Sequence, residues 1–134
     1  MRKFDSMVYL VDDDTDDLEL IQEALHRNHY TGPIATALNG LALMNALSKP
    51  KRILPRLILL DLNMPLKNGF EVLQEIKSDT DLKAIPVVVL TASRKAEDEK
   101  RCYALGCNLF QSKPDTIIEY NKLVVRIFGF LENR

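Results

Sequence analysis

The chain has 134 residues, of which 46% are hydrophobic and 28% are charged, and its formal net charge is −1. These values are ordinary for a soluble globular domain with a single core, and the balanced charge gives no reason to expect binding to nucleic acid or to an anionic membrane. The longest apolar runs have the length of strands, so we expect no membrane-spanning segment. The N-terminus lacks the apolar core of a secretory signal, and the two cysteines fit neither a disulfide framework nor a CxxC pair, so we expect a cytoplasmic location.

Apolar runs of strand length alternate with segments of helical periodicity along the chain. The expected strands are 7–11, 34–38, 57–60, 87–90 and a short one at 109–110. The expected helices run from 15 to about 28, from 40 through 47, from 70 through 76, from about 95 to 105, and from 115 or 116 through 131. Asp14 is expected to cap the first helix, and Gly106 to end the fourth.

Five repeats of strand and helix predict an α/β fold with a doubly wound parallel sheet, right-handed crossovers and helices on both faces. The alternation alone leaves both doubly wound strand orders open. Five strands in a chain of this length favour the flavodoxin-like (βα)5 arrangement, with strand order 2-1-3-4-5. Because the sequence contains no internal repeat, low-complexity tract or linker, we expect residues 1–134 to form a single domain.

The third expected strand, Leu57–Leu60, is apolar at every position, which is typical of a strand buried on both faces. It ends at Asp61 and is followed by a loop that contains Pro65 and Gly69. Ligands bind at the carboxyl ends of strands in open α/β sheets. Asp61 is therefore either a site residue or a polar strand terminus, and the rest of the chain must decide between them.

Polar side chains follow four of the expected strands. Asp12–Asp14 follow the first strand, Asp61 the third, Thr91 the fourth and Lys113 the fifth. In the order 2-1-3-4-5 these four strands are neighbours, so their side chains are expected to converge at one rim of the sheet. Clustered carboxylates need a cation and suit Mg²⁺, while a lysine and a hydroxyl suit the oxygens of a phosphate. An aspartate between them is placed to act as a nucleophile that forms an acyl phosphate.

This set of residues resembles the receiver domain of two-component response regulators, and the resemblance covers essentially the whole chain. It is carried by Val11-Asp12-Asp13, by Asp61 with Met64-Pro65 and Gly69, by Thr91-Ala92 and by Lys113-Pro114. The resemblance implies that Asp61 is the phosphoryl acceptor in a Mg²⁺-dependent reaction. It implies further that Asp13 and Asp61 bind Mg²⁺ directly, that Asp12 acts mainly through metal-bound water, and that Asn63 contributes its backbone carbonyl.

The resemblance also implies how the phosphoryl group is held and how the signal leaves the site. Thr91 and Lys113 would contact the phosphoryl oxygens, and the Lys113–Pro114 bond would be cis. Phe110 takes the position of the family's switch aromatic and would respond together with Thr91. Because Phe110 lacks a hydroxyl, its switching would rest on packing alone. The face made by the fourth helix, the fifth strand and the fifth helix would then change its affinity for partners.

Three segments resemble one subgroup, the stand-alone receivers found beside bacterial phytochromes and other sensor kinases. They are 57–63, 85–91 and the widened loop 48–56. This resemblance implies a sensor histidine kinase of the phytochrome or hybrid type as phosphodonor. Since the chain leaves no residues for an output domain, we expect the output to be a downstream protein partner, a homodimer or onward phosphotransfer.

Other functions make similar demands on a sequence. An aspartate-nucleophile phosphatase typically carries a second acid two residues after the nucleophile, and here that position is Asn63. We therefore expect a signalling module that accepts and loses its own phosphoryl group, not a turnover enzyme. A structural partner-binding domain with an idle pocket stays open as an alternative. Flavin binding is disfavoured, because the first strand leads into carboxylates that repel an anionic cofactor.

Overall fold

The computed structural model describes residues 7–50 and 52–132. Its strands form one parallel sheet in the order β2-β1-β3-β4-β5. The strands are β1 (Val8–Val11), β2 (Ile34–Ala37), β3 (Leu57–Leu60), β4 (Val87–Thr91) and β5 (Leu109–Ser112). The helices are α1 (Thr15–Arg27), α2 (Gly40–Leu47), α3 (Gly69–Ser78), α4 (Ala96–Ala104) and α5 (Ile117–Glu132). The predicted flavodoxin-like fold and its strand order are confirmed.

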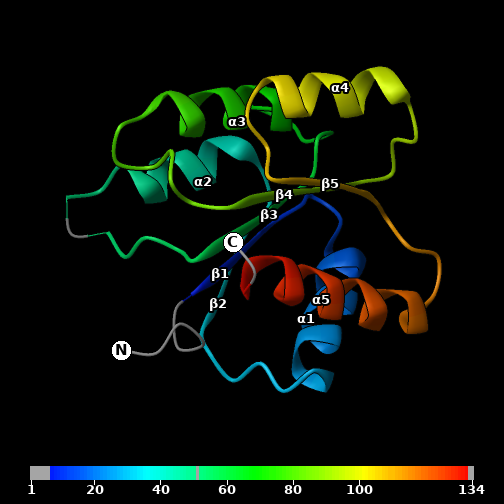
Figure 1. Cartoon of the computed structure of the whole chain (residues 1–134). Helices are drawn as coiled ribbons and strands as arrows, with labels where there is room; N and C mark the ends of the chain where they lie inside the picture. The colour runs from blue at the N-terminus through cyan, green and yellow to red at the C-terminus, as the bar shows by residue number, and fades with distance from the viewer. Residues whose placement is uncertain (1–6, 51, 133–134) are drawn as a thin grey trace.

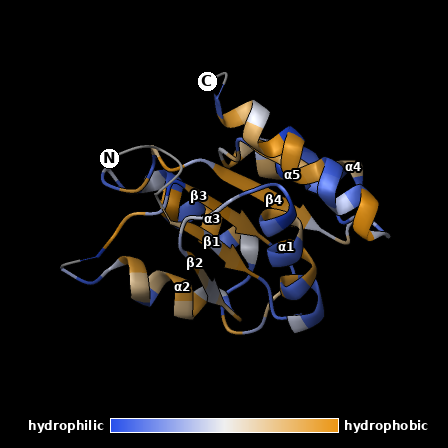
Figure 2. Cartoon of the chain, turned by 90° about the horizontal axis from the view of Figure 1, so that it is seen from below, coloured by the Kyte–Doolittle hydropathy of each residue, from blue (hydrophilic) through white to orange (hydrophobic). Residues whose placement is uncertain are grey.

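The sheet separates two helical layers, with α2, α3 and α4 on one face and α1 and α5 on the other (Figure 1). Each layer covers its own apolar cluster. One cluster includes Leu43 and Val72, and the other includes Ile21 and Leu123. Strands β3 and β4 are buried at every position and appear as hydrophobic ribbons between the helices (Figure 2). Their uniformly apolar sequences follow from burial on both faces.

Side chains and glycines define the helix ends close to where the sequence places them. Asp14 caps α1, because its Oδ1 accepts hydrogen bonds from the amides of Asp16 at 3.0 Å and Asp17 at 3.3 Å. Gly106 follows α4 with φ +104°, a left-handed conformation that favours glycine. Gly69 begins α3 against the end of β3, where an added Cβ would lie only 2.4 Å from the backbone oxygen of Asp61.

Strand β5 is longer than the predicted 109–110, because the ladder with β4 continues through Leu90↔Gln111 and Thr91↔Ser112. Polar residues are tolerated there since β5 is an edge strand and is half-buried along its length. Strand β3 has the predicted limits, and β1, β2 and β4 each differ from prediction by one residue at one end. In the part of the chain that the structure describes, no helix combines the length and the apolar character needed to cross a membrane.

Candidate functional site

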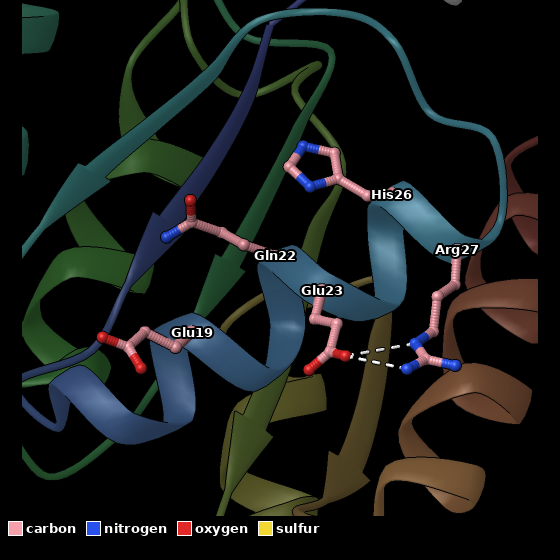
Figure 3. Close-up of a pocket in the computed structure, with 5 residues that line it drawn as sticks. All are labelled: Glu19, Gln22, Glu23, His26 and Arg27. Carbon is pink, nitrogen blue, oxygen red and sulfur yellow. Dashed lines mark hydrogen bonds and ion pairs between the residues drawn. The ribbon is translucent and has the colours of Figure 1, made fainter.

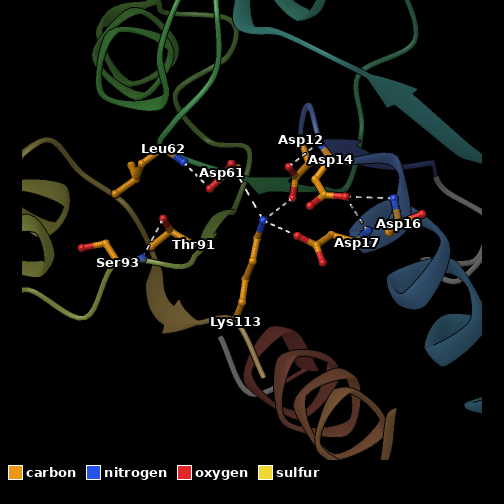
Figure 4. A network of polar contacts seen from close by, with 9 residues as sticks. All are labelled: Asp12, Asp14, Asp16, Asp17, Asp61, Leu62, Thr91, Ser93 and Lys113. Atoms are coloured by element: carbon orange, nitrogen blue, oxygen red, sulfur yellow. Dashed lines mark hydrogen bonds and ion pairs between the residues drawn. The ribbon is translucent and has the colours of Figure 1, made fainter. Parts of the chain in front are cut away.

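Four strands end at the same rim of the sheet and place polar side chains next to one another (Figure 4). Asp12 follows β1, Asp61 follows β3, Thr91 closes β4 and Lys113 follows β5. Backbone hydrogen bonds fix these positions: the Asp61 amide donates to the Val11 oxygen at 2.9 Å, and the Lys113 amide donates to the Thr91 oxygen at 2.7 Å. The sheet therefore brings these residues together, as the strand order predicts.

Asp12, Asp13 and Asp61 form an acidic cluster. Each offers one carboxylate oxygen, and the three oxygens lie within 4.8 Å of one another. Asp12 and Asp61 are 3% and 6% exposed, whereas Asp13 is open to solvent. Hard oxygen donors with one side open to water suit a divalent cation that keeps part of its hydration shell. Asn63 is exposed two residues beyond Asp61, and the role of its backbone carbonyl as a ligand stays a prediction.

Burial dominates the electrostatics of Asp61. It raises the pKa of the Asp61 carboxyl from its ordinary value of 3.8 to about 6, and the charge of Asp12 adds to the rise. The ammonium of Lys113, the Leu62 amide and the Thr91 hydroxyl act in the opposite direction. Burial also raises the pKa of Asp12, against the hydrogen bond from Lys113. Two desolvated carboxylates side by side are costly without a cation, which is a physical reason to expect one here.

The ammonium of Lys113 lies among three carboxylates. Its Nζ is 2.6 Å from Asp17 Oδ2, 2.8 Å from Asp12 Oδ2 and 3.9 Å from Asp61 Oδ2. Burial by itself lowers the pKa of Lys113, but the hydrogen bonds to Asp12 and Asp17 and the charge of Asp61 outweigh it, so the pKa is raised. Lys113 is therefore a fixed cation at the rim, held at hydrogen-bond distance by Asp12 and Asp17 and farther from Asp61.

Asp17 is a member of this network that the sequence analysis missed. In the sequence it stands with Asp14 and Asp16 at the start of a helix, where carboxylates are common. Its spacing from Ile21 and Ala24, both buried, is that of residues on one helical face, and this pattern was the signal available. The inner face of α1 thereby directs the Asp17 carboxylate toward Lys113 (Figure 4).

Thr91 and Phe110 occupy different surroundings. Thr91 is fully buried, and its Oγ1 accepts a hydrogen bond from the Ser93 amide at 3.3 Å. Phe110 is half-buried on β5 and packs against the apolar cluster beneath α2, α3 and α4. Its backbone amide donates to the hydroxyl of Tyr103 on α4 at 3.0 Å. The Tyr103 contact ties α4 to β5, and nothing in the sequence motif pointed to it.

The expectation of a cis bond between Lys113 and Pro114 is wrong for this structure. No peptide bond among the described residues is cis. Trans is the lower-energy isomer of an X–Pro bond by about 0.5–1 kcal/mol, so a cis bond forms only where surrounding contacts favour it. Here the Lys113 side chain reaches Asp12 and Asp17 from a trans bond.

A separate depression of about 540 Å³ lies on the surface of α1 (Figure 3). It is lined by Glu19, Gln22, Glu23, His26 and Arg27. Glu23 and Arg27 form an ion pair at 2.9 Å within the same helix. Because all the lining residues come from one helix and none belongs to the rim described above, this depression is not the candidate site.

Comparisons with known proteins agree with this geometry. Residues 8–126 match the family model of the response regulator receiver domain. The chain is 39% identical to response regulator Rcp1 of Synechocystis sp. over 128 residues, which cover 92% of this chain and 87% of that protein.

Solved structures give the same result at the level of the fold. The phosphorylated cyanobacterial phytochrome response regulator RcpA superposes with a TM-score of 0.84 at 39% identity, covering 94% of this chain and 93% of that one. The Mn²⁺-bound form of Rcp1 superposes with a TM-score of 0.85 at 39% identity, covering 93% of each chain. The cluster of Asp12, Asp13 and Asp61 fits the phosphorylation site of such proteins. The chain belongs to the receiver domains of two-component response regulators.

Proposed function

We propose that Asp61 accepts a phosphoryl group from the phosphohistidine of a sensor histidine kinase. The observation that carries the proposal is the convergence at the rim. The Asp61 carboxylate lies within 4.8 Å of the Asp12 and Asp13 oxygens and 3.9 Å from the Lys113 ammonium. A nucleophile, an acidic cluster for a cation and a fixed positive charge are the parts that phosphoryl transfer requires.

In the proposed transfer, an Asp61 carboxylate oxygen attacks phosphorus and the bond between phosphorus and the imidazole nitrogen breaks. The electron pair of that bond stays on the imidazole, which leaves as a neutral ring when its other nitrogen carries the proton. Thr91 and Lys113 donate hydrogen bonds to the phosphoryl oxygens. Transfer of this kind depends mainly on positioning and on charge stabilisation, and the residues at the rim supply both.

Mg²⁺ is the cation that we assign to the acidic cluster. Asp12, Asp13 and Asp61, with the backbone carbonyl of Asn63, are the groups that would hold it. When bound, it neutralises charge on the carboxylates and on the phosphoryl oxygens. The existence of a Mn²⁺-bound form of Rcp1 supports the binding of a divalent ion by this chain, and both its place at this cluster and the preference for Mg²⁺ are part of the proposal.

The proposed output is a change at the surface made by α4, β5 and α5. Phe110 would connect the site to this surface, because it lies on β5, which leads into Lys113, and its amide donates to the hydroxyl of Tyr103 on α4. Phosphorylation would draw Thr91 and Lys113 toward the phosphoryl group, and Phe110 would repack. The likeness to RcpA, a cyanobacterial phytochrome response regulator, supports a phytochrome-type kinase as donor. The signal would then pass to a protein partner, to a second copy of the chain or to a phosphotransfer protein.

We infer that the chain's own chemistry is limited to taking up and hydrolysing its phosphoryl group, without turnover of other substrates. Asn63, which is exposed two residues after Asp61, supports this, because no acid stands there to protonate a leaving group. We also assign the protein to the cytoplasm. Cys102 and Cys107 are free thiols, as expected in a reducing compartment.

The test is covalent labelling with radiolabelled acetyl phosphate and Mg²⁺, and with phosphorylated phytochrome-type kinases. Wild type should take up label that acid preserves and hydroxylamine releases, and excess EDTA should prevent the uptake. Asp61→Asn should lose the label because it removes the nucleophile. Asp16→Asn is the matched control, since it changes the same formal charge at an exposed residue outside the cluster. Label retained on Asp61→Asn would contradict the proposal.

A further inference from the structure

Lys113 is directed toward helix α1 more closely than toward the proposed acceptor. Its shortest contact is with Asp17, at 2.6 Å, whereas Asp61 lies 3.9 Å away. Figure 4 places Asp17 and Asp61 on opposite sides of the Lys113 ammonium. The Lys113 side chain is 13% exposed and that of Asp17 is 21% exposed. This ion pair is therefore shielded from solvent more than a pair on the open surface, where such contacts contribute little.

Lys113 is proposed to donate a hydrogen bond to a phosphoryl group on Asp61, but its ammonium is held closer to Asp12 and Asp17. A lysine ammonium has three N–H donors, and here two hydrogen bonds go to Asp12 and Asp17. A phosphoryl group on Asp61 needs the same ammonium, since the Asp61 oxygen now lies beyond hydrogen-bond distance. Asp12 belongs to the acidic cluster that fits a cation, whereas Asp17 lies outside that cluster. Asp17 thus stays a partner for Lys113 even when the cluster holds its ion.

We propose that Asp17 is a positioning residue that holds the Lys113 ammonium on the α1 side of the site until a phosphoryl group on Asp61 competes for it. This inference rests on the proposed function of Asp61. Asp17 makes no contact with Asp61 in the network of Figure 4 and acts only through Lys113. It competes with the phosphoryl group for the position of the same ammonium, so it favours the unphosphorylated form and sets how readily the site accepts its anion.

The direction of the effect separates positioning from a merely structural role. Loss of a structural contact between α1 and β5 would loosen the site and weaken the binding of a phosphoryl analogue. Removal of a competitor frees Lys113 and strengthens that binding. Since a charge-assisted hydrogen bond is stronger than a neutral one, we expect Asp17→Asn to bind the analogue about tenfold more tightly than wild type.

The probe is BeF₃⁻ titrated in the presence of Mg²⁺ and followed by ¹H–¹⁵N NMR on the full chain. The concentration at half-saturation should fall about tenfold in Asp17→Asn and should stay near the wild-type value in Asp17→Glu, which keeps the carboxylate. Asp16→Asn is the matched control, because Asp16 lies in the same helical turn, is exposed and carries the same charge. It should change half-saturation by less than about twofold.

A second readout does not depend on any variant folding. In ¹³C-labelled wild type, the side-chain carboxyl resonance of Asp17 should shift on BeF₃⁻ saturation as Lys113 leaves it, while that of Asp16 should stay in place. An unmoved Asp17 resonance, or a folded Asp17→Asn that binds BeF₃⁻ no more tightly than wild type, would overturn the inference alone. Wild-type protein that does not bind BeF₃⁻, or binding that persists in Asp61→Asn, would overturn the proposed function and this inference with it.

Discussion

Replacing Asp61 with asparagine should stabilise the metal-free protein near neutral pH. Asp61 is 6% exposed, and burial together with the charge of Asp12 raises the pKa of its carboxyl from 3.8 to about 6. Each tenfold change in an ionisation equilibrium corresponds to ~1.4 kcal/mol, so carrying the charge costs the folded state at most about 3 kcal/mol. Part of this cost remains because an asparagine amide is also desolvated. We therefore expect Asp61→Asn to raise the free energy of unfolding by about 2 kcal/mol.

The extra stability of Asp61→Asn over wild type should grow as pH rises from 3.8 to about 6. A carboxyl with a raised pKa keeps its proton longer in the folded state than in the unfolded chain, so between pH 3.8 and about 6 the folded state binds more protons. The contribution of Asp61 to wild-type stability therefore falls as pH rises through that window and stays low above it. Below the window the carboxyl is neutral in both states. The stability difference between Asp61→Asn and wild type should shrink there.

Urea unfolding followed by far-UV circular dichroism, in EDTA and at a series of pH values, measures this difference. Asp13→Asn is the matched control, because it removes a carboxylate from the same cluster at a solvent-exposed position and should change stability by less than about 0.5 kcal/mol. Mg²⁺ should reduce the stability difference between Asp61→Asn and wild type, since an ion that binds the folded wild-type protein stabilises that protein. A folded Asp61→Asn that is less stable than wild type near neutral pH, or one whose gain in stability is the same at every pH, would refute this prediction.

Two further predictions concern the stability of the fold. Gly69→Ala should lower the free energy of unfolding by about 2–3 kcal/mol, because a Cβ there would press on backbone atoms. Gly129→Ala is the control, because the space around Gly129 is open, and it should instead stabilise α5 by about 0.5 kcal/mol. Equal stabilities of the two variants in urea unfolding would contradict this prediction. Lys77→Met should lower the free energy of unfolding by about 2 kcal/mol. The Lys77 Nζ donates hydrogen bonds to the Ile85 oxygen at 2.7 Å and to Asn108 Oδ1 at 3.0 Å, and both acceptors would lose this donor. An unchanged thermal midpoint would show that these hydrogen bonds contribute nothing to stability.

The sequence predicts well which strands carry the site, because a buried strand has a uniformly apolar sequence. Strand β3 is apolar at every position since it is covered on both faces. Once the strand order is known, Asp61, Thr91 and Lys113 must meet, because parallel strands end at one rim. The cap at Asp14 and the left-handed Gly106 are local features that depend on nearby residues alone.

Features that depend on competition between distant groups were not predictable in the same way. Lys113 has three carboxylates within 4.0 Å, and a linear sequence does not rank them. The isomer of its bond to Pro114 depends on a free-energy difference too small for a motif to fix. Strand β5 extends past Phe110 because of its pairing with β4, which overrides the weak strand preference of Gln111 and Ser112.

The hydroxyl of Tyr103 has a consequence for how another protein can approach β5. An edge strand offers unpaired amides to which a foreign strand can add. The Phe110 amide is not available for this, because it already donates to Tyr103. Because the Phe110 amide already has an acceptor and that acceptor belongs to α4, a foreign strand cannot pair with β5 at Phe110. A protein that recognises this margin must read side chains, such as the half-exposed ring of Tyr103 itself, and not the backbone.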